Sequence, residues 1–159
     1  MARRVFFSFH YERDVWRASQ VRNSWVTKDR ESAGFWDAAS WEEVKKKGQS
    51  AIEKWIDDQL TGTSVTVVLI GSETSTRPYV DYEITASHKR GNGLLGIYIH
   101  NIKDSNQRTD TKGANPFNKW TFKNSEGKVI TFPTYDWVND DGRENLGDWV
   151  EAAATKAGR

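Results

Sequence analysis

The sequence predicts an α/β protein with a doubly wound parallel sheet of about five strands and helices on both faces. Short runs of β-branched and aromatic residues alternate along the chain with stretches of helical periodicity, as in repeated βαβ units. The run Val65–Ile70 is apolar except for Thr66, which is the pattern of a strand covered on both faces. No linker or internal repeat divides residues 1–159, so we expect a single domain.

The first half of the chain is expected to supply three strands and two helices. Residues 4–9 form a short apolar run that predicts the first strand, and a helix over 14–27 follows it. Residues 34–38 predict a short second strand. The next helix is expected to begin at Ser50, because Ser50-Ala51-Ile52-Glu53 matches a capping box. Val65–Ile70 is then the third and central strand.

The second half continues the alternation but contains an insertion. Pro78 suits the first position of a helix, which Gly91 should end. Residues 103–133 are a polar insertion, and Asn124-Ser125-Glu126-Gly127 within it predicts the turn of a β-hairpin. The other expected elements are strands at 94–99 and 135–138 and a closing helix at 145–156.

Composition excludes several classes of protein. The 23 basic and 22 acidic residues balance to a formal charge of +1, which argues against a nucleic-acid partner. Cysteine is absent, and His88 and His100 lack partners at ligand spacing, so we expect no disulfide, no Cys nucleophile and no metal. No apolar run is long enough to span a bilayer, and charged residues come too early for a signal peptide. A cytoplasmic protein that does not enter membranes is expected.

The strand order typical of flavodoxin-like sheets, 2-1-3-4-5, would place a ligand-binding crevice between the first and third strands. The loops 9–14 and 71–77 would then face each other. In the helix that follows, Glu83 lies one turn after Tyr79 and about 60° from the stripe through Val80, at the edge of the crevice. A carboxylate beside aromatic rings can have a raised pKa and can bind ribose hydroxyls.

Plainer interpretations remain open for these residues. Glu83 could be a solvated helical residue paired with a nearby Lys or Arg. His10, at the end of the first strand, could contact a ligand or simply bond to backbone. Asp37 resembles the acid that holds a ribose in dinucleotide folds, but acids at strand ends are more often turn or cap residues.

Two other functions of this fold fit the sequence poorly. A phosphoacceptor receiver needs acids after the first and third strands, where this chain has Ser8-Phe9-His10 and Gly71-Ser72. An FMN carrier needs its phosphate loop after the first strand, whereas the Ser/Thr-rich loop here follows the third.

The motifs of the chain resemble those of TIR domains. RVFFSFHYERD resembles their first strand and loop, and SVTVVLIGSETSTRPYVDYEI resembles their strand, serine loop and Trp-Cys-x-x-Glu helix. In this comparison Tyr79 takes the Trp position, Val80 the Cys position and Glu83 the Glu position. VFFSFHY, NSWVTK, LIGSETSTRPYVDYEI, KGANPF and YDWVNDDG, spread over almost the full length, are similar to the TIR-like ThsB family of the Thoeris anti-phage system.

This resemblance implies an enzyme that cleaves the nicotinamide–ribose bond of NAD, its substrate, without a cofactor. It further implies a cyclic ADP-ribose isomer that activates a separate effector, with a phage protein as trigger and self-association on activation. A non-catalytic signalling module is the alternative. The TIR loop Arg-Asp-x-x-Pro-Gly is absent, so assembly through that loop is not implied. By resemblance, Glu83 is the catalytic residue and the binding residues are Ser8, Phe9, His10, Asp37, Ser72 and Tyr79.

Overall fold

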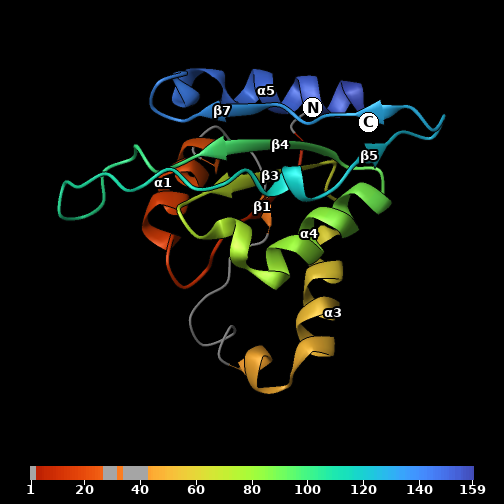
Figure 1. Cartoon of the computed structure of the whole chain (residues 1–159), viewed down its shortest axis with the longest axis horizontal. Coiled ribbons are helices and arrows are strands. Elements are labelled where there is room, and N and C mark those ends of the chain that lie inside the picture. The colour runs from red at the N-terminus through yellow and green to blue at the C-terminus, as the bar shows by residue number, and fades with distance from the viewer. Residues whose placement is uncertain (1–2, 27–31, 34–42) are drawn as a thin grey trace.

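The computed structural model describes residues 3–26, 32–33 and 43–159 (Figure 1). A parallel sheet of five strands forms its centre, in the order β2-β1-β3-β4-β7. This is the predicted doubly wound α/β fold with the predicted strand order. The strands are β1 (Val5–Ser8), β2 (Ser32–Ala33), β3 (Val65–Ile70), β4 (Gly93–Tyr98) and β7 (Thr134–Asp136).

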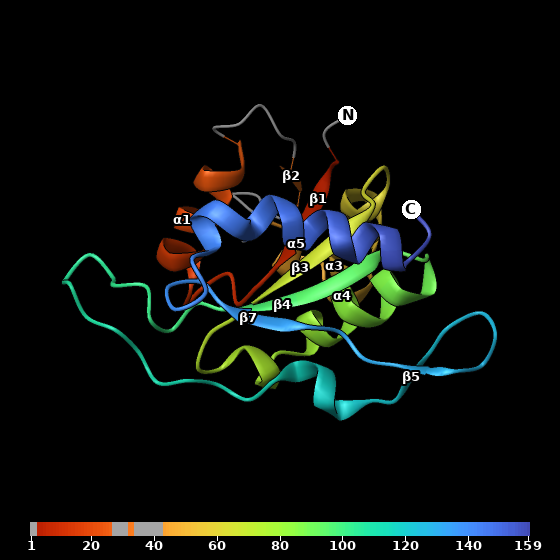
Figure 2. The ribbon, with the colours of Figure 1, turned by 90° about the horizontal axis from the view of Figure 1, so that it is seen from above.

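The central strands are buried because helices cover both faces of the sheet. Every residue of β1 and β3 is buried, as the continuous apolar run of β3 predicted. Figure 2 shows α1 and α5 over the near face, with α3 and α4 behind the sheet. The helices are α1 (Val15–Val26), α3 (Gln49–Leu60), α4 (Pro78–Lys89) and α5 (Gly142–Lys156). No helix among the described residues is long and apolar enough to cross a membrane.

Close packing of α5 on β4 depends on Gly93. A Cβ at this position would lie 2.4 Å from the backbone oxygen of Ala153, far inside van der Waals contact. The sheet and the helix can therefore approach one another only because this strand begins with a glycine.

The main differences from the predicted element boundaries lie in β2, α3 and α5. The second strand, β2, is at Ser32–Ala33, whereas the predicted stretch 34–38 lies outside the described residues. The predicted capping box is wrong, because α3 begins at Gln49 behind Gly48, with no side-chain cap. The closing helix α5 begins at Gly142, three residues before the predicted start.

The insertion between β4 and β7 contains the predicted hairpin. Its strands β5 (Phe122–Lys123) and β6 (Val129–Ile130) are antiparallel, after the 3₁₀ helix η2 (Pro116–Lys119). Gly127 has φ +79° in the turn. Three phenylalanine rings of the insertion pack against one another and join the hairpin to η2: Phe117, Phe122 and Phe132.

Candidate active site

The loops after β1 and β3 lie against each other, as predicted for this strand order. Ser8 of β1 pairs with Val68 of β3, so the two loops leave the sheet as neighbours. Across the gap, Arg13 Nε lies 2.8 Å from Glu73 Oε2. A Cβ on Gly71 would come within 2.2 Å of Asp14 Oδ2, so glycine is needed where the loops touch. The expected crevice is thus closed by direct contact between its walls.

Glu83 lies beneath this contact and is completely buried, with 0% of its surface exposed. Ser8 Oγ, at the end of β1, donates a hydrogen bond of 2.7 Å to Oε1. The Tyr11 hydroxyl, from the loop that follows, donates one of 2.7 Å to Oε2. Glu83 was expected at the edge of the crevice, but it is more deeply buried than that, because the end of β1 and the loop after it cover both carboxyl oxygens.

Burial raises the pKa of Glu83 to about 8, because removal from water disfavours the charged carboxylate. The hydrogen bonds from Tyr11 and Ser8 act in the opposite direction but are outweighed. An ordinary glutamate, with a pKa of 4.5, would be ionised at neutral pH, whereas Glu83 mostly keeps its proton there. A carboxyl group in this state can bind as a donor or, when ionised, stabilise a neighbouring positive charge.

The protein should lose stability as the pH rises from about 4.5 to about 8. In this window the folded protein holds the Glu83 proton and the unfolded chain has released it, so a higher pH favours unfolding. At about 1.4 kcal/mol per pH unit, the loss is at most roughly 5 kcal/mol. In urea denaturation between pH 5 and 9, the unfolding free energy of the wild type should fall relative to that of Glu83→Gln as the pH rises toward about 8. A difference independent of pH would contradict the raised pKa.

Aromatic rings cover the carboxyl group. Tyr11 stacks on Tyr79, with ring centroids 5.2 Å apart and planes within 12°. The Tyr79 hydroxyl accepts a bond from the backbone N–H of Tyr11 at 3.2 Å. Phe9 meets Tyr11 edge-on at 4.8 Å, and Trp55 of α3 meets it at 6.5 Å. Two of the predicted binding rings, Phe9 and Tyr79, therefore pack against Tyr11, the residue that bonds to Glu83.

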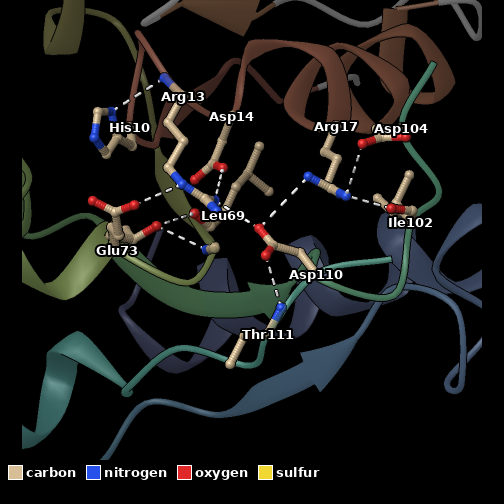
Figure 3. A network of polar contacts seen from close by, with 12 residues as sticks. His10, Arg13, Asp14, Arg17, Leu69, Glu73, Ile102, Asp104, Asp110 and Thr111 are labelled. Carbon is tan, nitrogen blue, oxygen red and sulfur yellow. Dashed lines mark hydrogen bonds and ion pairs between the residues drawn. The ribbon is translucent and has the colours of Figure 1, made fainter. Parts of the chain in front are cut away.

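A polar network joins the site to the insertion (Figure 3). Arg13 bonds to Asp14 at 3.0 Å and pairs with Asp110 at 2.7 Å, in addition to Glu73. Arg17 donates to the backbone oxygens of Ile102 and Arg108, at 2.7 and 2.9 Å. The beginning of the insertion is in this way bound to the loops that close over Glu83.

The structure gives different positions to the other predicted binding residues. His10 is buried, and its Nδ1 accepts a bond of 3.3 Å from the Arg13 backbone, which fits the plainer interpretation. Burial and the nearby Arg77 charge lower the pKa of His10. Ser72 is half-buried in the loop after β3. Asp37 lies outside the described residues.

A groove of about 1190 Å³ lies elsewhere, between α4, the hairpin and the end of α5. His88, Phe122 and Ile130 are among its lining residues, and Glu83 is not. Asn92 and Gly93, at the beginning of β4, also line the groove, whereas Ser8 and Gly71 mark the opposite, carboxyl-terminal edge of the sheet.

Sequence reasoning missed Tyr11, which donates a hydrogen bond to Glu83 and stacks on Tyr79. Tyr11 stands between His10 and Glu12, in a segment whose polar residues indicate a surface loop. A signal was present, since a large aromatic ring in a strand-end loop rarely stays exposed.

The strand order, together with a helix-borne carboxyl group under the ends of the first and third strands, is the arrangement of a TIR-like domain. The chain belongs to one family of these domains, because residues 6–104 match the family described as Thoeris protein ThsB, TIR-like domain. The match spans β1 to β4 and so includes Ser8, Tyr11 and Glu83.

A curated relative supports the family over a greater length. It comes from Bacillus cereus (strain MSX-D12) and is named "Putative cyclic ADP-D-ribose synthase ThsB1". The two chains are 36% identical over 191 aligned positions, which cover 94% of this chain and all of the relative. The similarity thus includes the insertion and α5, beyond the part that the family match covers.

Proposed function

We propose that this protein is a cytoplasmic enzyme of anti-phage defence that cleaves the nicotinamide–ribose bond of NAD and cyclises the remaining ADP-ribose. The product would be a second messenger for a separate effector protein. The observation that carries the proposal is the desolvated Glu83 carboxyl group, bonded to hydroxyls from β1 and its loop. The name of the Bacillus cereus relative supports a cyclic ADP-ribose product.

The reaction needs a group that stabilises positive charge on a sugar. As the C–N bond to nicotinamide breaks, both bonding electrons pass to the ring, which leaves as a neutral molecule. The positive charge moves to ribose C1′ and its ring oxygen. An adenosine atom then forms the new bond to C1′, and one proton is released. The cationic substrate would favour ionisation of Glu83, whose carboxylate would stabilise the sugar cation in a dry site.

Cyclisation requires that water be kept from the sugar cation. Tyr11 bonds to the carboxyl group, and the buried rings of Phe9 and Tyr79 pack against Tyr11, which makes an apolar surrounding that favours capture by the adenosine group over hydrolysis. Ser8 Oγ holds one carboxyl oxygen and so orients the group. The other oxygen is left for the substrate once Tyr11 moves.

Tyr11 occupies the place that a ribose hydroxyl would take on Glu83 Oε2. Substrate binding therefore has to displace the phenol, and the structure represents a resting state. Such a state is in keeping with an enzyme that needs a phage-derived trigger before it turns over NAD.

The test is to incubate the purified protein with NAD, with and without extract of phage-infected bacteria, and to follow nicotinamide and cyclic nucleotide by chromatography. We expect the amount of nicotinamide to equal the sum of cyclic nucleotide and free ADP-ribose, with free ADP-ribose as the minor product. No turnover under either condition would favour the non-catalytic signalling module, in which the buried carboxyl group is structural.

A further inference from the structure

Arg77 is a cation beside the candidate site, and none of the carboxylates that the structure describes is paired with it. It is the residue before Pro78, where α4 begins, and its guanidinium carbon lies 5.7 Å from the centroid of the Tyr79 ring. Among the described residues no carboxylate pairs with Arg77, and its Nε is buried without a hydrogen-bond partner. A half-buried guanidinium in this state is short of acceptors.

The carboxylates nearest to Arg77 along the chain already form ion pairs with other cations. Glu73, four residues earlier, pairs with Arg13 at 2.8 Å. Asp81, in the first turn of α4, pairs with Lys119 at 2.7 Å. The nearest carboxylates along the chain are therefore paired with other cations, and the charge of Arg77 remains for a ligand.

The positive charge of Arg77 affects the pKa of two residues beside the site, His10 and Tyr79. Its charge is one cause of the lowered pKa of His10, after burial. It also favours the ionised form of Tyr79, although burial outweighs this and raises the pKa of that phenol to about 12. An anion bound at this place would meet a positive potential.

The spacing along α4 suits a nucleotide. Arg77 precedes Glu83 by six residues, or roughly 9 Å along the helix axis. Ribose hydroxyls bonded to Glu83 would leave the 5′-phosphate of the same sugar within reach of the long Arg77 side chain. Arginine is suited to this task because its planar group binds two phosphate oxygens at once.

We propose that Arg77 binds the diphosphate of the substrate and so selects a dinucleotide over the nucleoside that lacks phosphate. The inference rests on the proposed action of Glu83 on NAD. It adds a binding residue that is not among those implied by the resemblance.

The kinetic test compares NAD with nicotinamide riboside, which has the same scissile bond and no phosphate. Arg77→Gln should raise KM for NAD by about 10- to 100-fold, the range expected for loss of a charge-assisted hydrogen bond, with kcat nearly unchanged. The kcat/KM for the riboside should not change, and Arg77→Lys should recover part of the loss. Lys89→Gln, which removes one exposed charge at the other end of α4, is the matched control. An equal loss for both substrates, or no loss for NAD, would overturn the proposal.

A binding measurement separates this proposal from the proposed function. Calorimetric titration with inorganic pyrophosphate, in the Glu83→Gln background, needs no turnover. Binding that disappears in Arg77→Gln and persists in Lys89→Gln supports the assignment even if NAD is never cleaved. Absence of binding, or binding that survives Arg77→Gln, contradicts it whether or not the enzyme is active.

Discussion

Glu83→Gln should reduce nicotinamide release from NAD by about 10³-fold or more, the effect expected when a charge-stabilising group is removed from a dry site. Gln is nearly isosteric with the protonated carboxyl group: its amide oxygen can accept a bond from one of the Ser8 and Tyr11 hydroxyls, and its NH2 group can donate to the other. It cannot become negative, so the sugar cation would lose its counter-charge. The measurement is steady-state nicotinamide release under the condition that activates the wild type.

The control for this substitution removes a carboxylate of the same type far from the site. Glu126 is exposed in the turn of the hairpin, so Glu126→Gln should leave turnover unchanged. Circular dichroism melting should show both variants folded, with Glu83→Gln at least as stable as wild type at pH 8. Full activity in a folded Glu83→Gln protein would remove Glu83 from the mechanism.

The fold could be predicted because its signals are local and periodic. The apolar run Val65–Ile70 gave the bounds of β3, and Pro78 gave the first residue of α4, since each follows from the chemistry of adjacent residues. The start of α3 could not be predicted in this way. Gly48 has φ +92° and takes the N-cap position, a choice that depends on the direction from which the chain enters the helix.

The complete burial of Glu83 depends on a contact that helical periodicity cannot predict. Helical geometry placed Glu83 about 60° from the buried stripe and thus at an edge. The side chain of Tyr11, from a loop distant in sequence, then closes this edge and takes the exposure to 0%. The direction of a loop side chain depends on tertiary packing, so the sequence indicated the carboxyl group but not its cover.

Two substitutions of Tyr11 should move the pKa of Glu83 in opposite directions. Tyr11→Phe keeps the ring and removes the bond to Oε2, which at present lowers the pKa, so the pKa should rise above about 8. Tyr11→Ala admits water to the carboxyl group and relieves the desolvation that is the largest cause of the raised value. Its pKa should fall toward 4.5. Carbon-13 NMR titration of the glutamate carboxyl groups, with the Glu83 signal assigned through Glu83→Gln, measures both.

The same two variants should also distinguish the effect of the Tyr11 ring on catalysis from the effect of its hydroxyl. If the ring is the barrier to substrate, Tyr11→Ala should raise turnover of NAD without a trigger, and Tyr11→Phe should raise it less, because the ring still lies on Tyr79. Tyr82→Phe is the matched control, since it removes a phenol that bonds at 2.9 Å to the exposed Asp57 on another part of the surface. Equal changes in NAD turnover in the two Tyr11 variants, or a change in turnover in Tyr82→Phe, would show that Tyr11 is not the barrier to substrate. The resting contact would then be incidental, and the site would have to be closed by another part of the chain.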